Sequence, residues 1–186
     1  MPYEWSKGEL VSCIPDEKTS TELLAKLTDF SLMLLKQGDL NDVLWSIVNY
    51  VGEVFGYNDF VLYLRIDRNM VQQAAYGVKS PSERSVLNQI TIPIGKGIVG
   101  ACAQTLKPLR VEDTAKDKRY IFDVYNGRSE LSVPIINEGC LIGILDSESC
   151  HPGFYDELDV AIFNAIAALC APRIVAAQFK TASVSI

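Results

Sequence analysis

Three carboxylates lie near the open end of a β-hairpin that the sequence predicts, where they could bind a ligand together. Residues 128–148 alternate apolar and polar side chains with the period of two that is typical of strands. If residues 137–139 (Asn-Glu-Gly) form a three-residue turn, Glu130, Asp146 and Glu148 share one face of the hairpin. Such a group could accept hydrogen bonds from a ligand amine or from backbone N–H groups. A structural role at the end of the sheet fits the same residues at least as well.

The three-residue turn also predicts the core face of the hairpin. It groups an entirely apolar set on the side opposite the acids, namely Leu131, Val133, Ile135, Leu141, Gly143 and Leu145. A two-residue turn at Glu138-Gly139 would instead place Glu130 and Asp146 on opposite faces. We therefore predict the three-residue turn, with Ser132, Pro134, Ile142 and Ile144 on the acid-bearing face.

Other motifs give little support for catalysis or metal binding. Gly95–Gly100 matches G-x-G-x-x-G, but Pro93 and Pro108 leave no room for the strand and full crossover helix of a dinucleotide site. We expect a glycine-lined turn there. His151 is the only histidine, which excludes multi-histidine metal cages, and with Cys150 it falls in a predicted surface loop. We find no convincing catalytic triad, and we expect neither a metal nor a cofactor.

Composition narrows the class of protein. The 186 residues are 48% hydrophobic and carry a net charge of −6, which suits one domain and argues against binding to nucleic acid or to an anionic membrane. The first residues lack a signal-peptide pattern, and no run of about 18 apolar residues indicates a membrane span. Five cysteines without C-x-x-C spacing suit reduced thiols. We therefore predict a cytoplasmic protein.

The order of the predicted elements indicates an α/β (α+β) fold with a mainly antiparallel sheet. We divide the chain into a flexible arm (1–18), an N-terminal helix (19–38), a domain (39–178) and a tail (179–186). A capping box at Thr19 and Glu22 opens the first helix, and Asp39 caps the second, which Gly56 ends. The remaining predicted elements are hairpins at 58–76 and 128–148, strands at 87–94 and 109–111, and helices at 97–106 and 155–178.

Apolar stripes on two helices need partners. The first helix carries Leu23, Leu27, Phe30 and Leu34, and the last carries Phe163, Ala167, Cys170 and Ile174, both with spacings of 4, 3 and 4. These stripes could pair within the chain, or they could meet a second copy in a four-helix bundle. We predict that they form the interface of a homodimer.

With these motifs in place, the chain resembles a GAF domain, a small sensory fold similar to PAS. The matching segments are Ile94–Gly100, Pro108–Asp113, Ser129–Ile135, Gly139, Leu141–Asp146 and Phe154–Asp159. The resemblance covers about residues 39–178. It implies a GAF/PAS-like central antiparallel sheet of five to six strands, with the N- and C-terminal helices packed on one face. A ligand cavity would lie on the other face, roofed by residues 113–127.

The resemblance also implies a binding site, a dimer and a signalling partner. The implied ligand contacts are Phe122, Tyr125, Glu130, Ser132, Asp146 and Glu148, and the small molecule is unknown. Dimerisation through the terminal helices would pass a signal to an output domain or to a separate partner. Bilin-binding members carry a Cys-His pair before the final hairpin, whereas Cys150-His151 follows it. Phe154 with Asp156-Glu157 has the wrong spacing for a cyclic-nucleotide signature.

Three functions follow, and a non-catalytic sensor module leads. The second is an enzyme similar to free methionine-(R)-sulfoxide reductase, in which acids at these hairpin positions hold the substrate's amine. Val99 stands where that family has a reactive cysteine, residues 120–125 contain none, and Cys102 is three residues late, so we disfavour this function. The third is a purely structural dimerisation domain whose cavity is filled.

Overall fold

The protein forms one six-stranded sheet in which every neighbouring pair of strands is antiparallel. The computed structural model describes residues 17–36, 38–124 and 126–184. The strands are β1 (Asp59–Ile66), β2 (Asn69–Gly77), β3 (Thr91–Pro93), β4 (Leu109–Val111), β5 (Ser129–Asn137) and β6 (Cys140–Ser149). Their order across the sheet is β3-β2-β1-β6-β5-β4. The predicted antiparallel α/β fold is therefore confirmed.

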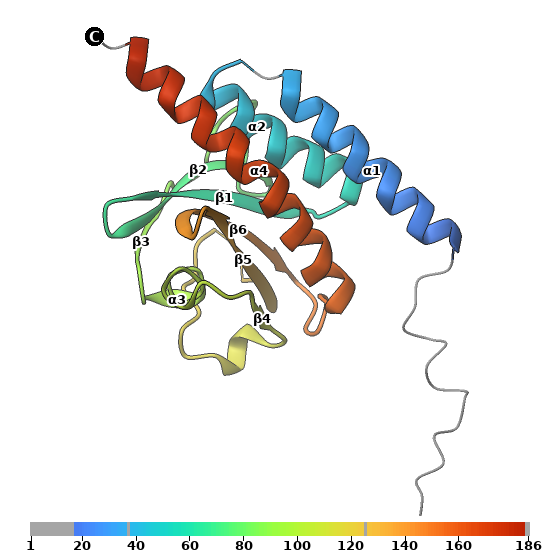
Figure 1. Ribbon diagram of the computed structural model, residues 1–186. Coiled ribbons are helices and arrows are strands. Elements are labelled where there is room, and N and C mark those ends of the chain that lie inside the picture. The colour runs from blue at the N-terminus through green and yellow to red at the C-terminus, as the bar shows by residue number, and fades with distance from the viewer. Residues whose placement is uncertain (1–16, 37, 125, 185–186) are drawn as a thin grey trace, which may run out of the picture.

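Three helices cover one face of the sheet, and a short helix lies on the other (Figure 1). The covering layer consists of α1 (Glu17–Lys36), α2 (Leu40–Tyr50) and α4 (Glu157–Val184), with a π-helical turn, η1 (Val51–Phe55), extending α2. On the opposite side lie α3 (Gly97–Thr105) and the 3-10 turn η2 (Thr114–Lys116). The sheet is therefore the middle layer of three.

Local signals explain where the first two helices begin and end. The carboxylate of Asp39 accepts a hydrogen bond from the backbone N–H of Asp42 at 2.8 Å, which caps α2 as predicted. Gly56 ends the extension of α2 with a φ of 82°, in the left-handed region that favours glycine. The first helix begins at Glu17, two residues before the predicted capping box. Most of the predicted arm lies outside the described residues.

The longest helix, α4, packs one side against the sheet. It continues through Pro172 and ends beyond the predicted residue 178. By length and composition alone its stretch Glu157–Lys180 could cross a membrane, a criterion that the core helices of other folds also meet. Within that stretch Phe163 and Ile174 have no exposed surface and belong to the core beneath the helices.

The hairpin of β5 and β6 has a two-residue turn, so the predicted three-residue turn is wrong. Asn137 pairs with Cys140, which leaves only Glu138 and Gly139 in the turn. Both turn residues have positive φ, 50° and 78°. This conformation is typical of the type I′ turn, whose twist matches that of the adjoining strands.

A β-bulge explains why the acids nevertheless share one face. The register shifts between Ile135 and Ile136, and Ile142 is the additional residue on β6. One extra residue reverses the alternation of faces and thereby compensates for the shorter turn. Beyond the bulge the predicted faces are regained, with the pairs Glu130–Glu148, Ser132–Asp146 and Val133–Leu145. Between bulge and turn, Leu141 faces away from the helices, which corrects its predicted place.

The two faces of the sheet belong to different hydrophobic cores. The core under the helices includes Leu131, Val133, Ile135 and Leu145, as predicted. The smaller core, between the sheet and α3, includes Leu141 and Ile144. Near the turn, the bulge therefore reverses the predicted faces of β6, whereas beyond the bulge the predicted faces hold. The acids lie on the side of the smaller core.

The stripes predicted for a dimer interface pair within the chain. The six members Phe30, Leu34, Phe163, Ala167, Cys170 and Ile174 are at most 3% exposed. Leu23 and Leu27 are partly exposed. The guanidinium of Arg173 on α4 also donates to the backbone carbonyl of Leu34 at 2.9 Å. The intrachain alternative therefore accounts for the six, and a dimer stays a prediction that other side chains of these helices would have to carry.

Candidate functional site

Five carboxyl groups gather on the sheet face opposite the covering helices. We call Asp59, Asp123, Glu130, Asp146 and Glu148 the acid cluster, and each residue is at most 9% exposed. Cross-strand pairing of β5 with β6 brings together the three acids predicted from the hairpin. Strand β1 contributes Asp59, and Asp123 comes from residues 113–127, which we call the roof. Ser132, also predicted, donates its hydroxyl to Asp146 at 2.5 Å.

Lys79 is the only buried cation in the described part of the chain, and it lies within the acid cluster. Its Nζ is 2.5 Å from Glu148 Oε1, 3.5 Å from Asp59 Oδ2 and 3.7 Å from Asp123 Oδ2. Five carboxyl groups therefore face one ammonium group. A surplus of buried charge of one sign is costly unless protons or other cations offset it.

Bound protons offset part of this surplus. Burial, together with the negative charges of Asp146 and Glu148, raises the pKa of Glu130 well above its ordinary value. Burial also raises the pKa of Asp59 to about 7, although Lys79 opposes the rise. The same two effects bring the pKa of Asp146 to about 6. We expect Glu130 to keep its proton at neutral pH and to donate it to Asp146 in a hydrogen bond.

Four oxygen atoms of the acid cluster have no hydrogen-bond partner in the described structure. They are both carboxylate oxygens of Asp59 and both of Asp123. The Nζ of Lys79 attracts these two groups electrostatically, but its distances of 3.5 and 3.7 Å exceed those of ordinary hydrogen bonds. Buried polar atoms are nearly always hydrogen-bonded in native proteins. These four oxygens therefore retain an unused capacity to accept hydrogen bonds.

The roof is fastened to the acid cluster through Tyr120 and Gly127. The Tyr120 hydroxyl donates to Glu148 Oε2 at 2.8 Å and accepts from the backbone N–H of Gly127 at 3.0 Å. The Thr114 hydroxyl donates to the carbonyl of Gly127 at 2.5 Å. A β-carbon at position 127 would lie 2.2 Å from Glu148 Oε2, so any other residue would have to displace this carboxyl group.

The cavity between the sheet and the roof is nearly filled. Its volume is about 10 Å³, roughly the space that one water molecule needs. Four members of the acid cluster line it together with apolar residues of β3, α3 and the roof. A ligand larger than water could therefore enter only if the roof or Lys79 moved.

Two predicted ligand contacts come from the roof, and the structure differs for one of them. Phe122 is 63% exposed, whereas its neighbours Ile121 and Asp123 line the cavity. Successive side chains of an extended segment point to opposite sides, so Phe122 faces away from the cavity. Tyr125 lies outside the described residues.

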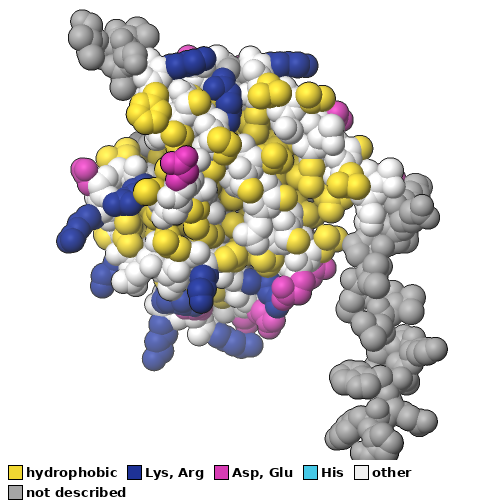
Figure 2. Space-filling model, viewed as in Figure 1, with side chains coloured by type: hydrophobic (Ala, Val, Ile, Leu, Met, Phe, Trp, Pro, Cys, Tyr) yellow, Lys and Arg dark blue, Asp and Glu magenta, His cyan; other side chains and the backbone are white. Residues whose placement is uncertain are grey.

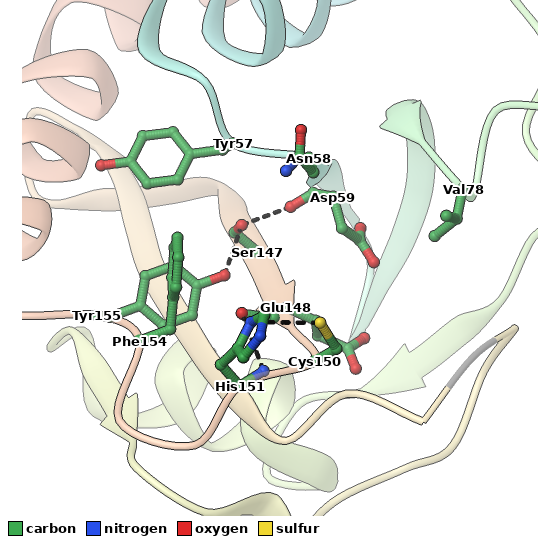
Figure 3. Close-up of a pocket in the computed structure, with 11 residues that line it drawn as sticks. Tyr57, Asn58, Asp59, Val78, Ser147, Glu148, Cys150, His151, Phe154 and Tyr155 are labelled. Carbon is green, nitrogen blue, oxygen red and sulfur yellow. Dashed lines mark hydrogen bonds between the residues drawn. The ribbon is translucent and has the colours of Figure 1, made fainter.

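A larger and more open pocket lies at the end of the sheet, beside the acid cluster (Figure 3). It has a volume of about 250 Å³ and lies between the start of β1, the end of β6 and the loop that leads to α4. Tyr57, Phe154 and Tyr155 supply aromatic walls. Asp59 and Glu148 also line this pocket, so the acid cluster borders both spaces.

The thiols of this region are unequal. Cys150 lines the open pocket in the exposed loop that was predicted, with its Sγ 3.3 Å from Nδ1 of His151. Cys102 lies in the smaller core, where it is fully buried and donates its thiol to the carbonyl of Ser132 at 3.4 Å. Burial raises the pKa of Cys102, which keeps it protonated. In the ranges that the structure describes, no group of three or more His, Cys, Asp or Glu side chains could hold a metal ion.

Four residues of the site were not predicted, namely Asp59, Lys79, Tyr120 and Asp123. Asp59 begins a strand whose other residues are mainly apolar, and an acid in such a strand was a signal that could have been followed. Lys79 follows β2 in an irregular segment, where its sequence surroundings resemble those of an ordinary surface lysine. Only the folded arrangement brings it to Glu148, 69 residues later in the chain.

Comparison with known proteins gives one family match and several distant relatives. A family model described as "GAF domain" matches residues 39–174. The cGMP-specific 3',5'-cyclic phosphodiesterases of Drosophila erecta and Drosophila melanogaster are both 32% identical to this chain, over 120 and 115 residues. These matches cover 58% of the chain but only 11% and 10% of the two phosphodiesterases.

Solved structures agree in fold. The GAF domain from a phosphoenolpyruvate-protein phosphotransferase of Coxiella burnetii superposes with a TM-score of 0.77 at 20% identity, covering 88% of this chain and 98% of that one. Free methionine-R-sulfoxide reductase from Neisseria meningitidis, in complex with its substrate, gives a TM-score of 0.75 at 22% identity, with coverages of 90% and 96%. At these identities the likeness is one of fold.

Proposed function

Because the chain belongs to the GAF domain family, we propose that it is a non-catalytic regulatory module that binds a small molecule between its sheet and its roof. Binding would change the positions of α1 and α4, and these helices would pass the change to an output domain or to a separate partner. The proposed setting is the cytoplasm. Neither nucleic acid nor membrane is part of the proposal, because the net charge of −6 suits neither surface.

The excess of buried acid is the observation that carries this proposal. A domain that needed only a filled core could place apolar side chains under the roof at lower cost, because burying an unpaired polar atom is unfavourable. This chain instead keeps five carboxyl groups there, two of them with no hydrogen bond in the described structure. Strained or unsatisfied groups of this kind are typical of binding sites.

The hairpin offers a physical route from the site to the helices. Strands β5 and β6 carry the acids on one face and core residues on the other. Leu131, between Glu130 and Ser132, belongs to the core that α4 covers. A ligand that shifts the acid-bearing face would therefore also shift the surface on which α4 packs.

We also propose a homodimer, formed by exposed apolar side chains of the helical layer. Leu24, Leu32 and Leu35 on α1 and Phe179 on α4 are each more than half exposed. Figure 2 shows hydrophobic side chains gathered over these helices. Leu35→Glu should convert the dimer into a monomer, as measured by light scattering, whereas Ile66→Glu at the end of β1 should not. Equal masses for native protein and Leu35→Glu would contradict this interface.

The charge of the site argues for a cationic or neutral ligand. A cyclic nucleotide carries a negative phosphate, which the carboxylates of the acid cluster would repel. In this proposal, the similarity to cGMP-specific phosphodiesterases therefore supports a regulatory role, and it does not extend to cGMP as the ligand. We expect calorimetry to detect no binding of cGMP at concentrations up to about 1 mM.

Two other functions compete with the proposal. An enzyme like the sulfoxide reductases would need a reactive thiol, and buried Cys102 with its raised pKa is a poor candidate. A purely structural domain is favoured by one observation, the small volume of about 10 Å³ under the roof. Turnover of free methionine-(R)-sulfoxide that Cys102→Ala abolishes would establish the enzyme.

Small molecules that co-purify with the protein provide the decisive test. We expect extraction and mass spectrometry to find a compound retained by the native chain. Asp146→Asn should bind this compound with an affinity at least about 10-fold lower, because a hydrogen bond to a charged group is lost. Asp67→Asn, an exposed control, should retain it normally. If nothing co-purifies and no compound of a metabolite library raises the melting temperature, the structural domain is the better account.

A further inference from the structure

Lys79 occupies the place in which a ligand would meet the acid cluster. We infer that its ammonium group is an internal substitute for the ligand, and that the ligand carries a primary ammonium group that displaces Lys79. This inference rests on the proposed function and specifies both the class of ligand and what must move to admit it.

Lys79 is surrounded by carboxyl groups as a bound cation would be, but it forms a hydrogen bond with only one of the three that it contacts. Its Nζ lies among Glu148, Asp59 and Asp123, and its side chain is 1% exposed. Only the distance to Glu148, 2.5 Å, is that of a hydrogen bond. The other two carboxylates keep oxygens without hydrogen bonds. An ammonium group that is not attached to the backbone could approach all three, because it has three N–H donors and no fixed position.

Lys79 contacts carboxyl groups that line two separate spaces. Glu148 and Asp59 line the open pocket of about 250 Å³, and Glu148 and Asp123 line the small cavity of about 10 Å³ under the roof. Lys79 holds members of both linings at once. A ligand bound in the open pocket would therefore meet the carboxylates that Lys79 now occupies, and withdrawal of the lysine would give it access to the remaining acids.

The segment that carries Lys79 could make such a movement. Residues 78–90 form neither helix nor strand. The neighbouring Val78 is 54% exposed beside the open pocket. The backbone carbonyl of Lys79 accepts one bond from the N–H of Leu87 at 2.8 Å, a contact within the same segment. The far end of the segment is tied to α2 by Arg84, which pairs with Asp42, and to β2 by residues 89–90, so the movement would be confined to the residues around Lys79.

A built-in competitor has a measurable consequence for affinity. If the ligand binds only when Lys79 is withdrawn, the apparent dissociation constant equals the intrinsic one divided by the fraction of time that Lys79 is withdrawn. Removing the lysine should therefore tighten the binding of a primary ammonium compound. Removing an exposed lysine should change nothing.

The test uses the full chain with Lys79→Ala and the exposed control Lys107→Ala. The probes are ethyl-, propyl- and butylammonium chloride, with tetramethylammonium chloride at equal ionic strength, because it has charge but no N–H donor. We expect the primary ammonium salts to raise the melting temperature of Lys79→Ala saturably by about 4 °C or more. The native chain and Lys107→Ala should bind butylammonium at least about 10-fold more weakly. If Lys79→Ala does not fold alone, recovery of folded protein on refolding with each salt replaces the melting temperature.

A second variant separates occupancy from simple loss of charge. Lys79→Met fills much of the same volume, so it should gain far less from butylammonium than Lys79→Ala gains. Equal effects of butylammonium and tetramethylammonium on Lys79→Ala would overturn the inference. So would a co-purified ligand without a cationic nitrogen, although the proposed regulatory function would then stand. If no ligand were found but primary ammonium salts still stabilised Lys79→Ala, the regulatory function would be contradicted. The role of Lys79 as an internal cation would then still be supported.

Discussion

Asp59→Asn should stabilise the protein at pH 8 and change its stability little at pH 4. The pKa of Asp59 is raised from 3.8 to about 7, chiefly by burial. The native state thus keeps the proton of this carboxyl to a higher pH than the unfolded chain does. Stability must then fall as the pH rises from about 4 to about 7, and it should stay level above that range. Asparagine cannot ionise, so the variant loses this dependence.

The magnitude follows from the size of the shift. One pKa unit corresponds to about 1.4 kcal/mol, so Asp59 should cost on the order of 4 kcal/mol between pH 4 and pH 7. Roughly 2–3 kcal/mol of this cost should appear between pH 5 and pH 8. The side chain is 3% exposed, so screening by solvent should reduce the effect little. The raised pKa values of Glu130 and Asp146 give native stability the same sign of dependence.

Urea unfolding at pH 5, 6, 7 and 8, followed by circular dichroism, measures this difference. The comparison is between the native chain, Asp59→Asn and the exposed control Asp67→Asn. We expect the native chain and the control to lose stability with rising pH, and Asp59→Asn to lose roughly 2–3 kcal/mol less. The reasoning is refuted if native stability rises from pH 5 to pH 7, or if Asp59→Asn shows the same slope as the control.

Further predictions concern the roof and the thiols. Tyr120→Phe should lose about 1.5–3 kcal/mol of unfolding free energy, because its hydroxyl donates to the buried carboxyl group of Glu148. The same variant should speed amide exchange across the roof, and unchanged exchange would contradict a fastening role. Gly127→Ala should lower the melting temperature because its β-carbon would displace Glu148; a higher melting temperature would oppose this. Among the described cysteines, iodoacetamide under native conditions should label exposed Cys140 and Cys150 and spare buried Cys102 and Cys170, as peptide mapping can verify.

Sequence patterns predicted the fold well because they reflect local physics. The helix cap at Asp39 and the strand over 109–111 depend on adjacent residues, and both lie where expected. The grouping of Glu130 with Asp146 and Glu148 is also correct, although the turn that was assumed for it is not. Alternation along β5 and β6 favoured the right faces beyond the bulge but the wrong face for Leu141, because the bulge had no comparable signal in the sequence.

The candidate site was less predictable because long-range packing decides it. Lys79 reaches Glu148 only because β2, β1 and β6 are neighbours in the sheet. Its burial depends on that order of strands rather than on its sequence neighbours. Phe122 shows the opposite difficulty, since an aromatic residue in a roof suggests a ligand contact, yet the direction of its side chain depends on the extended backbone around it.

The bulge at Ile142 has a consequence for how this hairpin can vary in evolution. It acts as a phase shift between the tip of the hairpin and the acids. Deleting Ile142 alone would place the residues near the tip on the opposite face relative to those beyond the deletion. Either the acids would then face the helical core, or core leucines would leave it. A one-residue insertion in the turn would restore the original sides. Homologous hairpins should therefore show length changes in compensating pairs, so that the tip can be remodelled while the chemistry at the far end stays in place.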